Sequence, residues 1–498
     1  MMGWKMALRN GRADVLRMPP GRLTRQALVL WLLPMVAVIY MLVFAAAPRV
    51  HGLSYTVALL FPVGAFLIAT LIVAAIQPAH ATAASWLVMT GAALGAGAII
   101  VFTRTRYVQL LPVSIGPSTL ATLAALGMAG AVAGAWLAAD GSNRPPALVV
   151  LVALAVAAML VTDVRVVASL FERDLLLDLR AGDAILHGQP VYSAVALSRA
   201  PADPTLLPFV YPPVTLPLFA VLTQLPRGLV EAFWFVLTVV TSIGALRAFG
   251  VRWRWVPILL AWPPFVQGIW TGNANSLLIL GFALGPFVPS GLVLLSLVKP
   301  QLAILALWLP RERRWRPLVK ALAVITLVCL GTLPIVGLDS WRQWLGALAA
   351  FSQTSANIPS IQALALVRQF GPQLTLVVAG ALLLLGLARR DREGLATLGL
   401  ASMAASPTLY LHGLGLGLPS ILWLRGAAIW FLVAITSSFI RQQDWWLLVA
   451  VVAIAPLIPV LVDGGRADAS IHPIGSGLRP WPTDPVQADP GDAPSPPP

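Results

Sequence analysis

Charge, histidine and cysteine are all scarce in this sequence. Only 10% of its 498 residues are charged, and the chain contains five histidines and a single cysteine, Cys329. A soluble domain needs charged residues at about a quarter of its positions to cover its surface. The low charge therefore excludes a soluble enzyme. The single cysteine gives no basis for a disulfide or for a metal site built from thiolates.

Hydrophobic residues are abundant in this sequence. They make up 58% of the chain, and the mean hydropathy is +0.85. A helix that crosses a bilayer needs about 20 predominantly apolar residues, and such stretches follow one another for most of the sequence. The composition therefore predicts an all-α polytopic integral membrane protein.

Most of the expected spans can be placed from these apolar stretches. A span is expected near 394–411, and the apolar stretches after it, up to Val462, allow two or four further crossings, because breaks such as Pro419 and Arg425 do not settle the count. The other spans are expected near 27–47, 54–76, 84–102, 118–138, 147–165, 208–225, 229–248, 254–270, 273–289, 290–309, 318–336 and 372–388.

Basic residues set the expected orientation. The net charge of +14 is concentrated in the N-terminal segment and a few short loops, which indicates contact with lipid headgroups and not with nucleic acid. The positive-inside rule places the basic N-terminus in the cytoplasm, so the polar segment after five spans emerges on the extracytoplasmic side. The basic loops at 311–316 and 389–392 then fall in the cytoplasm, whereas Arg104 and Arg247 do not follow the rule.

The sequence divides into five expected parts. They are a basic cytoplasmic N-terminus (1–26), a four-span N-terminal extension (27–141), a transmembrane core (147–440), a C-terminal span (441–462) and a disordered tail rich in proline and aspartate (463–498).

The first polar segment, from about 169 to 207, gathers the acidic residues. Asp174 and Asp178 stand four residues apart and share one helix face, and Asp183 and His187 repeat this spacing on a neighbouring face. A carboxylate beside a hydroxyl can accept its proton as the oxygen attacks. The simpler interpretation is that these side chains solvate a surface helix, with Arg173 and Arg180 as ion-pair partners.

The residues that follow add a more specific pattern. An Asp, then Ala and Gly at fixed distances, then Tyr, and a Tyr-Pro-Pro that opens the next span, resemble the polyprenol-phosphate-mannose-dependent mannosyltransferases of glycosyltransferase family 87, within the GT-C superfamily. The residues in this pattern are Asp174, Ala184, Gly188, Tyr192, Tyr211, Pro212 and Pro213.

Later patches follow in the family's order. Gly272-Asn-Ala-Asn275 is similar to the family's Gly-Gln-x-Asn, although Asn273 stands where Gln is usual, and this departure weakens a side-chain role at 273. Lys299-Pro-Gln is similar to a Lys-Pro element, and Ser406-Pro…His412 to a Ser-Pro…His element. A weaker match runs from Asn357 to Gln362. The resemblance is expected to cover 147–440.

The resemblance implies transfer of a sugar from polyprenyl phosphate, with inversion, on the extracytoplasmic face. Asp174 would be the general base, and Lys299 or His412 would stabilise the departing phosphate. The span count places Lys299 in mid-span or nearer the cytoplasm, where it could simply snorkel. The further implied site residues are Tyr211 and Asn275 for the donor, and Asp178, Tyr192 and Gln362 for the sugar or acceptor.

The sequence shows no histidine or carboxylate residues spaced as metal ligands. A metal-independent transferase without a cofactor is therefore expected. Its partners would be a polyprenyl-phosphate sugar, a glycolipid or polysaccharide acceptor, and membrane lipids. Mannose is implied by the resemblance alone, and the acceptor is not identified. A polytopic transporter or lipid flippase is the main alternative, and a catalytically inactive scaffold is a second.

Overall fold

The computed structural model describes residues 171–192, 209–355, 364–389, 391–424, 427–437 and 445–454, together with five isolated positions between 155 and 166. The expected N-terminal segment, four-span extension and tail lie outside these residues, as does Gln362. The elements below belong to one compact unit, Ser169–Pro498.

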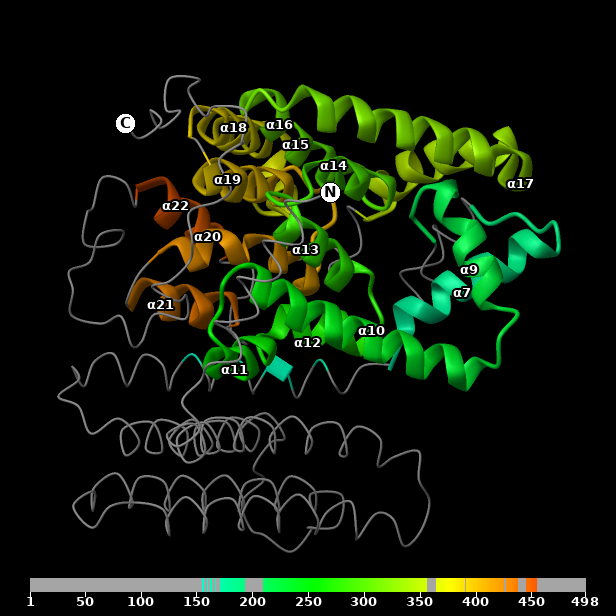
Figure 1. Cartoon of the computed structure of the whole chain (residues 1–498), viewed down its shortest axis with the longest axis horizontal. Coiled ribbons are helices and arrows are strands. Elements are labelled where there is room, and N and C mark those ends of the chain that lie inside the picture. Colours follow the sequence, from blue (N-terminus) through cyan, green and yellow to red (C-terminus); the bar gives the residue numbers. More distant parts are fainter. Residues whose placement is uncertain are drawn as a thin grey trace, which may run out of the picture. The chain divides into compact units, whose positions relative to one another are not determined.

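Every element in the described part of the chain is a helix (Figure 1), which confirms the all-α fold class. In chain order the elements are α7 (Arg173–Leu186), η3 (Pro213–Thr215), α9 (Leu216–Leu222), α10 (Arg227–Ala248), η4 (Trp253–Trp255), α11 (Val256–Leu260), α12 (Pro263–Trp270), α13 (Asn275–Leu284), α14 (Pro289–Leu294), η5 (Leu295–Leu297), η6 (Pro300–Leu302), α15 (Ala303–Ala306), α16 (Trp308–Arg311), α17 (Trp315–Ser355), α18 (Leu366–Ala388), α19 (Asp391–Ala404), η7 (Leu411–Gly417), α20 (Leu418–Trp423), α21 (Ala427–Thr436) and α22 (Trp446–Ile454).

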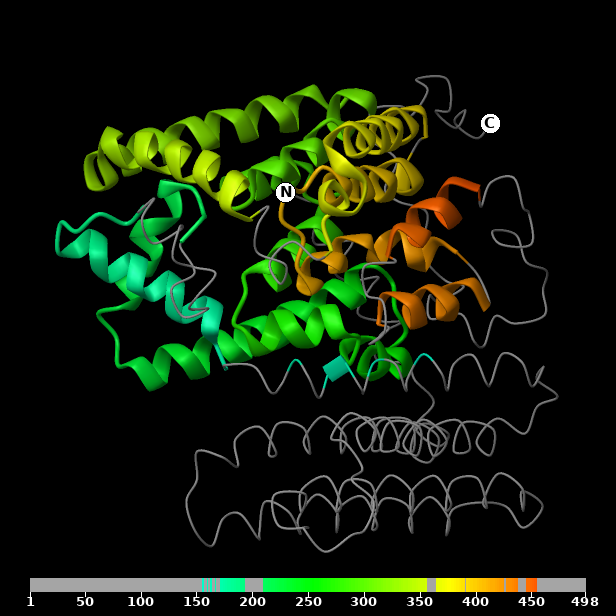
Figure 2. The same cartoon turned by 180° about the vertical axis from the view of Figure 1, so that it is seen from behind.

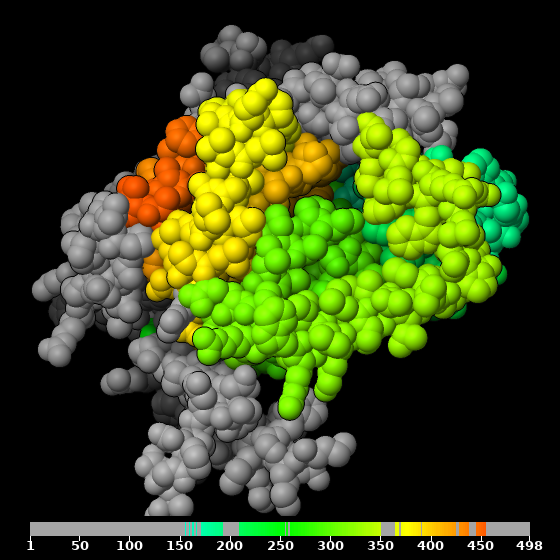
Figure 3. Space-filling model, turned by 90° about the horizontal axis from the view of Figure 1, so that it is seen from above, coloured from blue at the N-terminus to red at the C-terminus, as the bar shows by residue number. Residues whose placement is uncertain are grey.

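Three of these helices are long and apolar enough to cross a membrane. They are α10, the Trp315–Ala349 part of α17 and the Phe370–Ala388 part of α18, which agree with expected spans. Large apolar side chains of α17, such as Leu327 and Leu330, are exposed, and α17 lies uncovered on the face seen in Figure 3. An exposed apolar helix face in a membrane protein is the surface that lipid covers.

Two of the long helices are broken by glycine. α17 contains Pro334 and a non-helical Gly337 with φ of 71°, and α18 is interrupted at Gly371 with φ of 79°, followed by Pro372. The helix therefore continues beyond residue 336, where the expected span ends, and reaches Ser355 after the break at Gly337.

The segments 254–270, 273–289 and 290–309, each expected as a single span, are not single regular helices. The structure divides them into short helices, none longer than the ten residues of α13. Proline is the reason, because it fits the first turn of a helix but ends the helix before it. Pro263, Pro289 and Pro300 each open a new element. Irregular backbone at membrane depth is tolerated where protein covers it.

The polar segment forms α7, which packs against α9 (Figures 1 and 2). The two backbones meet at Gly182, where a Cβ atom would lie 2.4 Å from the carbonyl carbon of Phe219. The backbone N–H groups of Glu172 and Asp174 donate to the carbonyls of Trp270 and Thr271, both at 2.8 Å. The start of α7 therefore caps the end of α12, and this junction positions the site.

Candidate active site

Asp174 is fixed by hydrogen bonds on both of its oxygens. Oδ1 accepts from Arg173 Nε at 3.1 Å. Oδ2 accepts from Thr271 Oγ1 at 3.0 Å and from Asn273 Nδ2 at 2.8 Å. Burial alone would raise the pKa of Asp174, but the Arg173 guanidinium and these hydrogen bonds outweigh it and hold the pKa below its ordinary value of 3.8. Asp174 is therefore a carboxylate at neutral pH.

Asn273 has a direct role that the sequence comparison underestimated. Its amide nitrogen donates to Asp174, and its amide oxygen accepts the backbone N–H of Asn275 at 3.0 Å. The shorter side chain in place of Gln still bridges the start of α13 to Asp174. The expectation that this departure weakens a role for residue 273 was therefore wrong.

The turn that carries Asn273 depends on Gly272. Its φ of 68° is in the left-handed region, which glycine alone adopts without cost. A Cβ atom there would also lie 2.9 Å from the Cβ of Leu175, next to Asp174. The Gly272 carbonyl accepts from Trp234 Nε1 at 2.7 Å, so the turn is held between α7 and α10.

We therefore expect Gly272→Ala to destabilise the folded protein more than Gly188→Ala does. Both glycines have a positive φ, but a Cβ atom added at Gly188 would meet no other atom within 4 Å. Gly188→Ala should carry only the backbone cost, about 1–2 kcal/mol, whereas Gly272→Ala adds the contact with Leu175, roughly a further 1–3 kcal/mol. Thermal unfolding in detergent measures both, and equal midpoints for the two variants would contradict this interpretation.

A second polar chain runs from Asn273 to Lys299. Lys299 Nζ donates to Asn275 Oδ1 at 2.6 Å and lies 5.9 Å from the centroid of the Tyr211 ring. Burial raises the pKa of Asp178, and the Lys299 ammonium opposes that effect. The chain before Lys299 is divided into short helices, and this path places Lys299 at the site. The span count had placed Lys299 in mid-span or nearer the cytoplasm.

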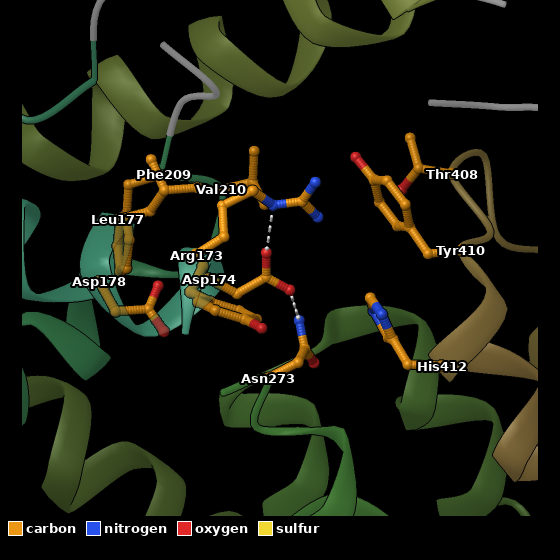
Figure 4. A pocket seen from close by; sticks show the side chains of 11 residues that line it. Arg173, Asp174, Leu177, Asp178, Phe209, Val210, Asn273, Thr408, Tyr410 and His412 are labelled. Atoms are coloured by element: carbon orange, nitrogen blue, oxygen red, sulfur yellow. Dashed lines mark hydrogen bonds and ion pairs between the residues drawn. The ribbon is translucent and has the colours of Figure 1, made fainter. Parts of the chain in front are cut away.

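His412 lies across the pocket from Asp174 (Figure 4). It is buried in η7, and its ring stacks on Tyr410 with centroids 5.4 Å apart and planes 14° apart. Burial and the Lys299 ammonium lower the pKa of His412 to about 3, so its ring is neutral. The pocket is lined by Arg173, Asp174, Leu177, Asp178, Phe209, Val210, Tyr211, Asn273, Thr408, Tyr410 and His412.

The two acidic pairs of α7 have different surroundings. Asp183 and His187 are exposed and 3.4 Å apart, as the solvated-surface interpretation expects. Asp178 is buried, and its Oδ2 has no hydrogen-bond partner in the described part of the chain. Burial and the neighbouring Asp174 carboxylate raise the pKa of Asp178 well above its ordinary value. The solvated-surface interpretation is therefore wrong for Asp178.

This raised pKa predicts a pH-dependent effect of Asp178→Asn on stability. As the pH rises above about 4, the unfolded chain releases the Asp178 proton before the folded protein does, and the folded state loses stability. Asparagine does not ionise, so the variant does not lose stability in this way. We expect the apparent Tm of the variant to exceed that of the wild type by about 2–4 °C at pH 8 and to equal it at pH 4. A lower Tm at pH 8 would show that Asp178 acts as a stabilised carboxylate.

The tyrosines occupy different positions. Tyr211 lines the pocket, and its backbone carbonyl accepts from the Tyr192 hydroxyl at 2.8 Å. Tyr192 lies in the apolar cluster that also contains Phe209 and Phe219, so it supports Tyr211 from behind and does not line the pocket.

Three residues near the site were not predicted, whereas Arg173 was expected as an ion-pair partner. Thr271 and Arg173 bind Asp174, Tyr410 stacks on His412, and Gln267 binds His412. Thr271 adjoins one recognised patch and Tyr410 lies within another, and this position was a usable signal. Gln267 has no such signal, because it lies in an apolar stretch without a motif. The described residues contain no group of three or more His, Cys, Asp or Glu side chains that could hold a metal ion.

Comparison with known proteins gives one family. The family model of glycosyltransferase family 87 matches residues 209–407. The matched segment is shorter than the 147–440 expected; it contains Tyr211, Asn275 and Lys299, whereas α7 precedes it and His412 follows it. No curated protein and no solved structure matches the chain.

Proposed function

Because residues 209–407 mark this chain as a membrane glycosyltransferase of family 87, we propose that it transfers mannose from a polyprenyl-phosphate donor to an acceptor hydroxyl on the extracytoplasmic face. The observation that carries the proposal is the fixed carboxylate of Asp174 in a pocket that His412 lines on its other side. The acceptor would be a glycolipid or a polysaccharide. The family match favours this activity over a transporter or flippase.

Asp174 would act as the general base through one particular oxygen. A carboxylate oxygen accepts two hydrogen bonds in its plane, and Oδ2 already accepts from Thr271 and Asn273. Oδ1 accepts only from Arg173 in the described part of the chain. Oδ1 is therefore the atom that takes the proton as the acceptor oxygen bonds to the anomeric carbon and the bond from that carbon to the phosphate oxygen breaks.

Lys299 would stabilise the departing phosphate, which gains a negative charge as that bond breaks. Its ammonium is held by Asn275, which is joined through Asn273 to Asp174. The base and the cation are therefore positioned by one series of hydrogen bonds, which passes through the backbone N–H of Asn275. Tyr211 lines the pocket, and its ring would pack against the bound donor.

The test is sugar transfer by the purified chain in proteoliposomes. Radiolabelled polyprenyl-phosphate-mannose and a labelled nucleotide-mannose are supplied separately, with membrane lipid extract as acceptor. Label should pass from the lipid-linked donor alone, and transfer from the nucleotide sugar alone would overturn the proposed donor class.

We also propose that the transferase needs no metal ion, since Lys299 can supply the positive charge at the phosphate. Transfer should be unchanged in excess chelator. Activity that disappears in chelator and returns with a divalent cation would contradict this proposal.

A further inference from the structure

Gln267 makes two hydrogen bonds to His412 with one atom. Its Oε1 lies 2.8 Å from the backbone nitrogen of His412 and 3.1 Å from Nδ1 of the ring. A backbone N–H can only donate, so the Gln267 atom that faces it is the acceptor oxygen. The same oxygen can bind Nδ1 only if Nδ1 carries a proton. The geometry therefore selects one tautomer of His412.

In that tautomer Nε2 has a free lone pair. The part of the chain that the structure describes offers Nε2 no hydrogen-bond partner, since the ring's one polar contact is with Gln267 through Nδ1. The side chain is only 4% exposed and lines the pocket. The stacked Tyr410 ring fixes its plane. An acceptor that opens onto a pocket can bind a donor group of a molecule held there.

The charges around His412 keep it neutral. Burial disfavours an imidazolium most, the cations Lys299 and Arg173 add to this effect, and the Asp174 carboxylate opposes it. A neutral ring with a bare Nε2 cannot donate to a phosphate oxygen. It can accept a hydrogen bond from a hydroxyl.

One helix positions both sides of the pocket. Gln267 and Thr271 are four residues apart at the end of α12, so they lie on one face. Gln267 binds His412, and Thr271 donates to Asp174. A change in α12 would therefore move both groups together.

We propose that Gln267 is a positioning residue that holds His412 as the Nδ1–H tautomer, so that Nε2 accepts a hydrogen bond from a hydroxyl of the sugar or of the acceptor. The role of Nε2 rests on the proposed transferase function. The tautomer does not, because it follows from hydrogen bonds within the protein. It replaces the expectation that His412 stabilises the phosphate as a cation.

The tautomer can be observed directly. The full chain is labelled with ¹⁵N-histidine and embedded in lipid nanodiscs, and the His412 signals are assigned by their loss in His412→Asn. At pH 7 we expect a protonated Nδ1 and an unprotonated Nε2. Gln267→Glu retains the acceptor oxygen and should retain this pattern, with a raised His412 pKa. A protonated Nε2 in the wild type, as the other tautomer or as imidazolium, overturns the proposal whatever the activity.

Kinetics tests the role of Nε2. Gln267→Leu removes the acceptor and should lower kcat about 10- to 100-fold, as loss of an orienting partner does for metal-bound histidines. Gln267→Glu should restore most of the activity at pH values above its raised His412 pKa. The control Gln224→Leu, at an exposed glutamine, should match the wild type. A Gln267→Leu enzyme as active as this control would overturn the proposal.

The KM values of Gln267→Leu for the two substrates show which substrate carries the hydroxyl that binds Nε2. A raised KM for the donor in Gln267→Leu identifies a sugar hydroxyl, and a raised KM for the acceptor identifies the acceptor hydroxyl. If the wild type transfers sugar from no donor, the proposed function fails, and the ¹⁵N spectrum still decides whether Gln267 fixes the tautomer.

Discussion

Replacing Asp174 by asparagine is expected to lower kcat by about 10²- to 10⁴-fold, the contribution that a positioned general base makes. Asparagine keeps the size of the side chain but cannot take the acceptor's proton. The donor KM should change little, because Lys299 and Tyr211 are untouched. The measurement is transfer from labelled polyprenyl-phosphate sugar in proteoliposomes at matched protein amounts.

Asp183→Asn is the matched control for this experiment. It makes the same change on the same helix, but at an exposed carboxylate paired with His187. It should leave kcat within about twofold of the wild type, as surface substitutions usually perturb little. If Asp174→Asn and Asp183→Asn were equally active, Asp174 would have no part in the chemistry.

Lys299→Met is expected to have the second-largest effect, a fall in kcat of about 10²- to 10³-fold. Methionine keeps an unbranched side chain but removes the ammonium that would face the departing phosphate. It also removes the hydrogen bond to Asn275. Transfer is measured with the same donor over a range of concentrations, so that kcat and KM are separated.

The result distinguishes two roles for this lysine. A snorkelling lysine contributes mainly through its methylene groups, and methionine would replace it with little loss. Lys320→Met, at an exposed lysine of α17, controls for the loss of one positive charge from the chain. Activity equal to that of Lys320→Met would remove Lys299 from the phosphate site.

The residues of the candidate site could be predicted from the sequence more fully than their geometry. Asp174, Lys299 and His412 belong to recognisable patches, and the structure places all three in or beside one pocket. The four-residue spacing predicted that Asp174 and Asp178 share a face. It could not predict the burial of Asp178, because burial depends on how α7 packs against its neighbours.

The path of the backbone was harder to predict. Hydropathy located α10, α17 and α18, because each is long and apolar. It treated the segment from 254 to 309 as three regular spans, since apolar composition does not report where prolines end helices. The depth assigned to Lys299 followed from that assumption. Gln267 could not be found at all, because its role depends on the contact between α12 and η7.

The division of this segment into short helices has a consequence for biogenesis. α10, α17 and α18 are long enough to enter a bilayer individually with their backbone groups satisfied. The pieces from α11 to α16 are too short to do so, and their open ends need protein partners. We therefore expect the long helices to insert individually and the short ones to fold against them afterwards. The candidate pocket, whose two sides are held by Gln267 and Thr271 at the end of α12, would be completed only at that stage.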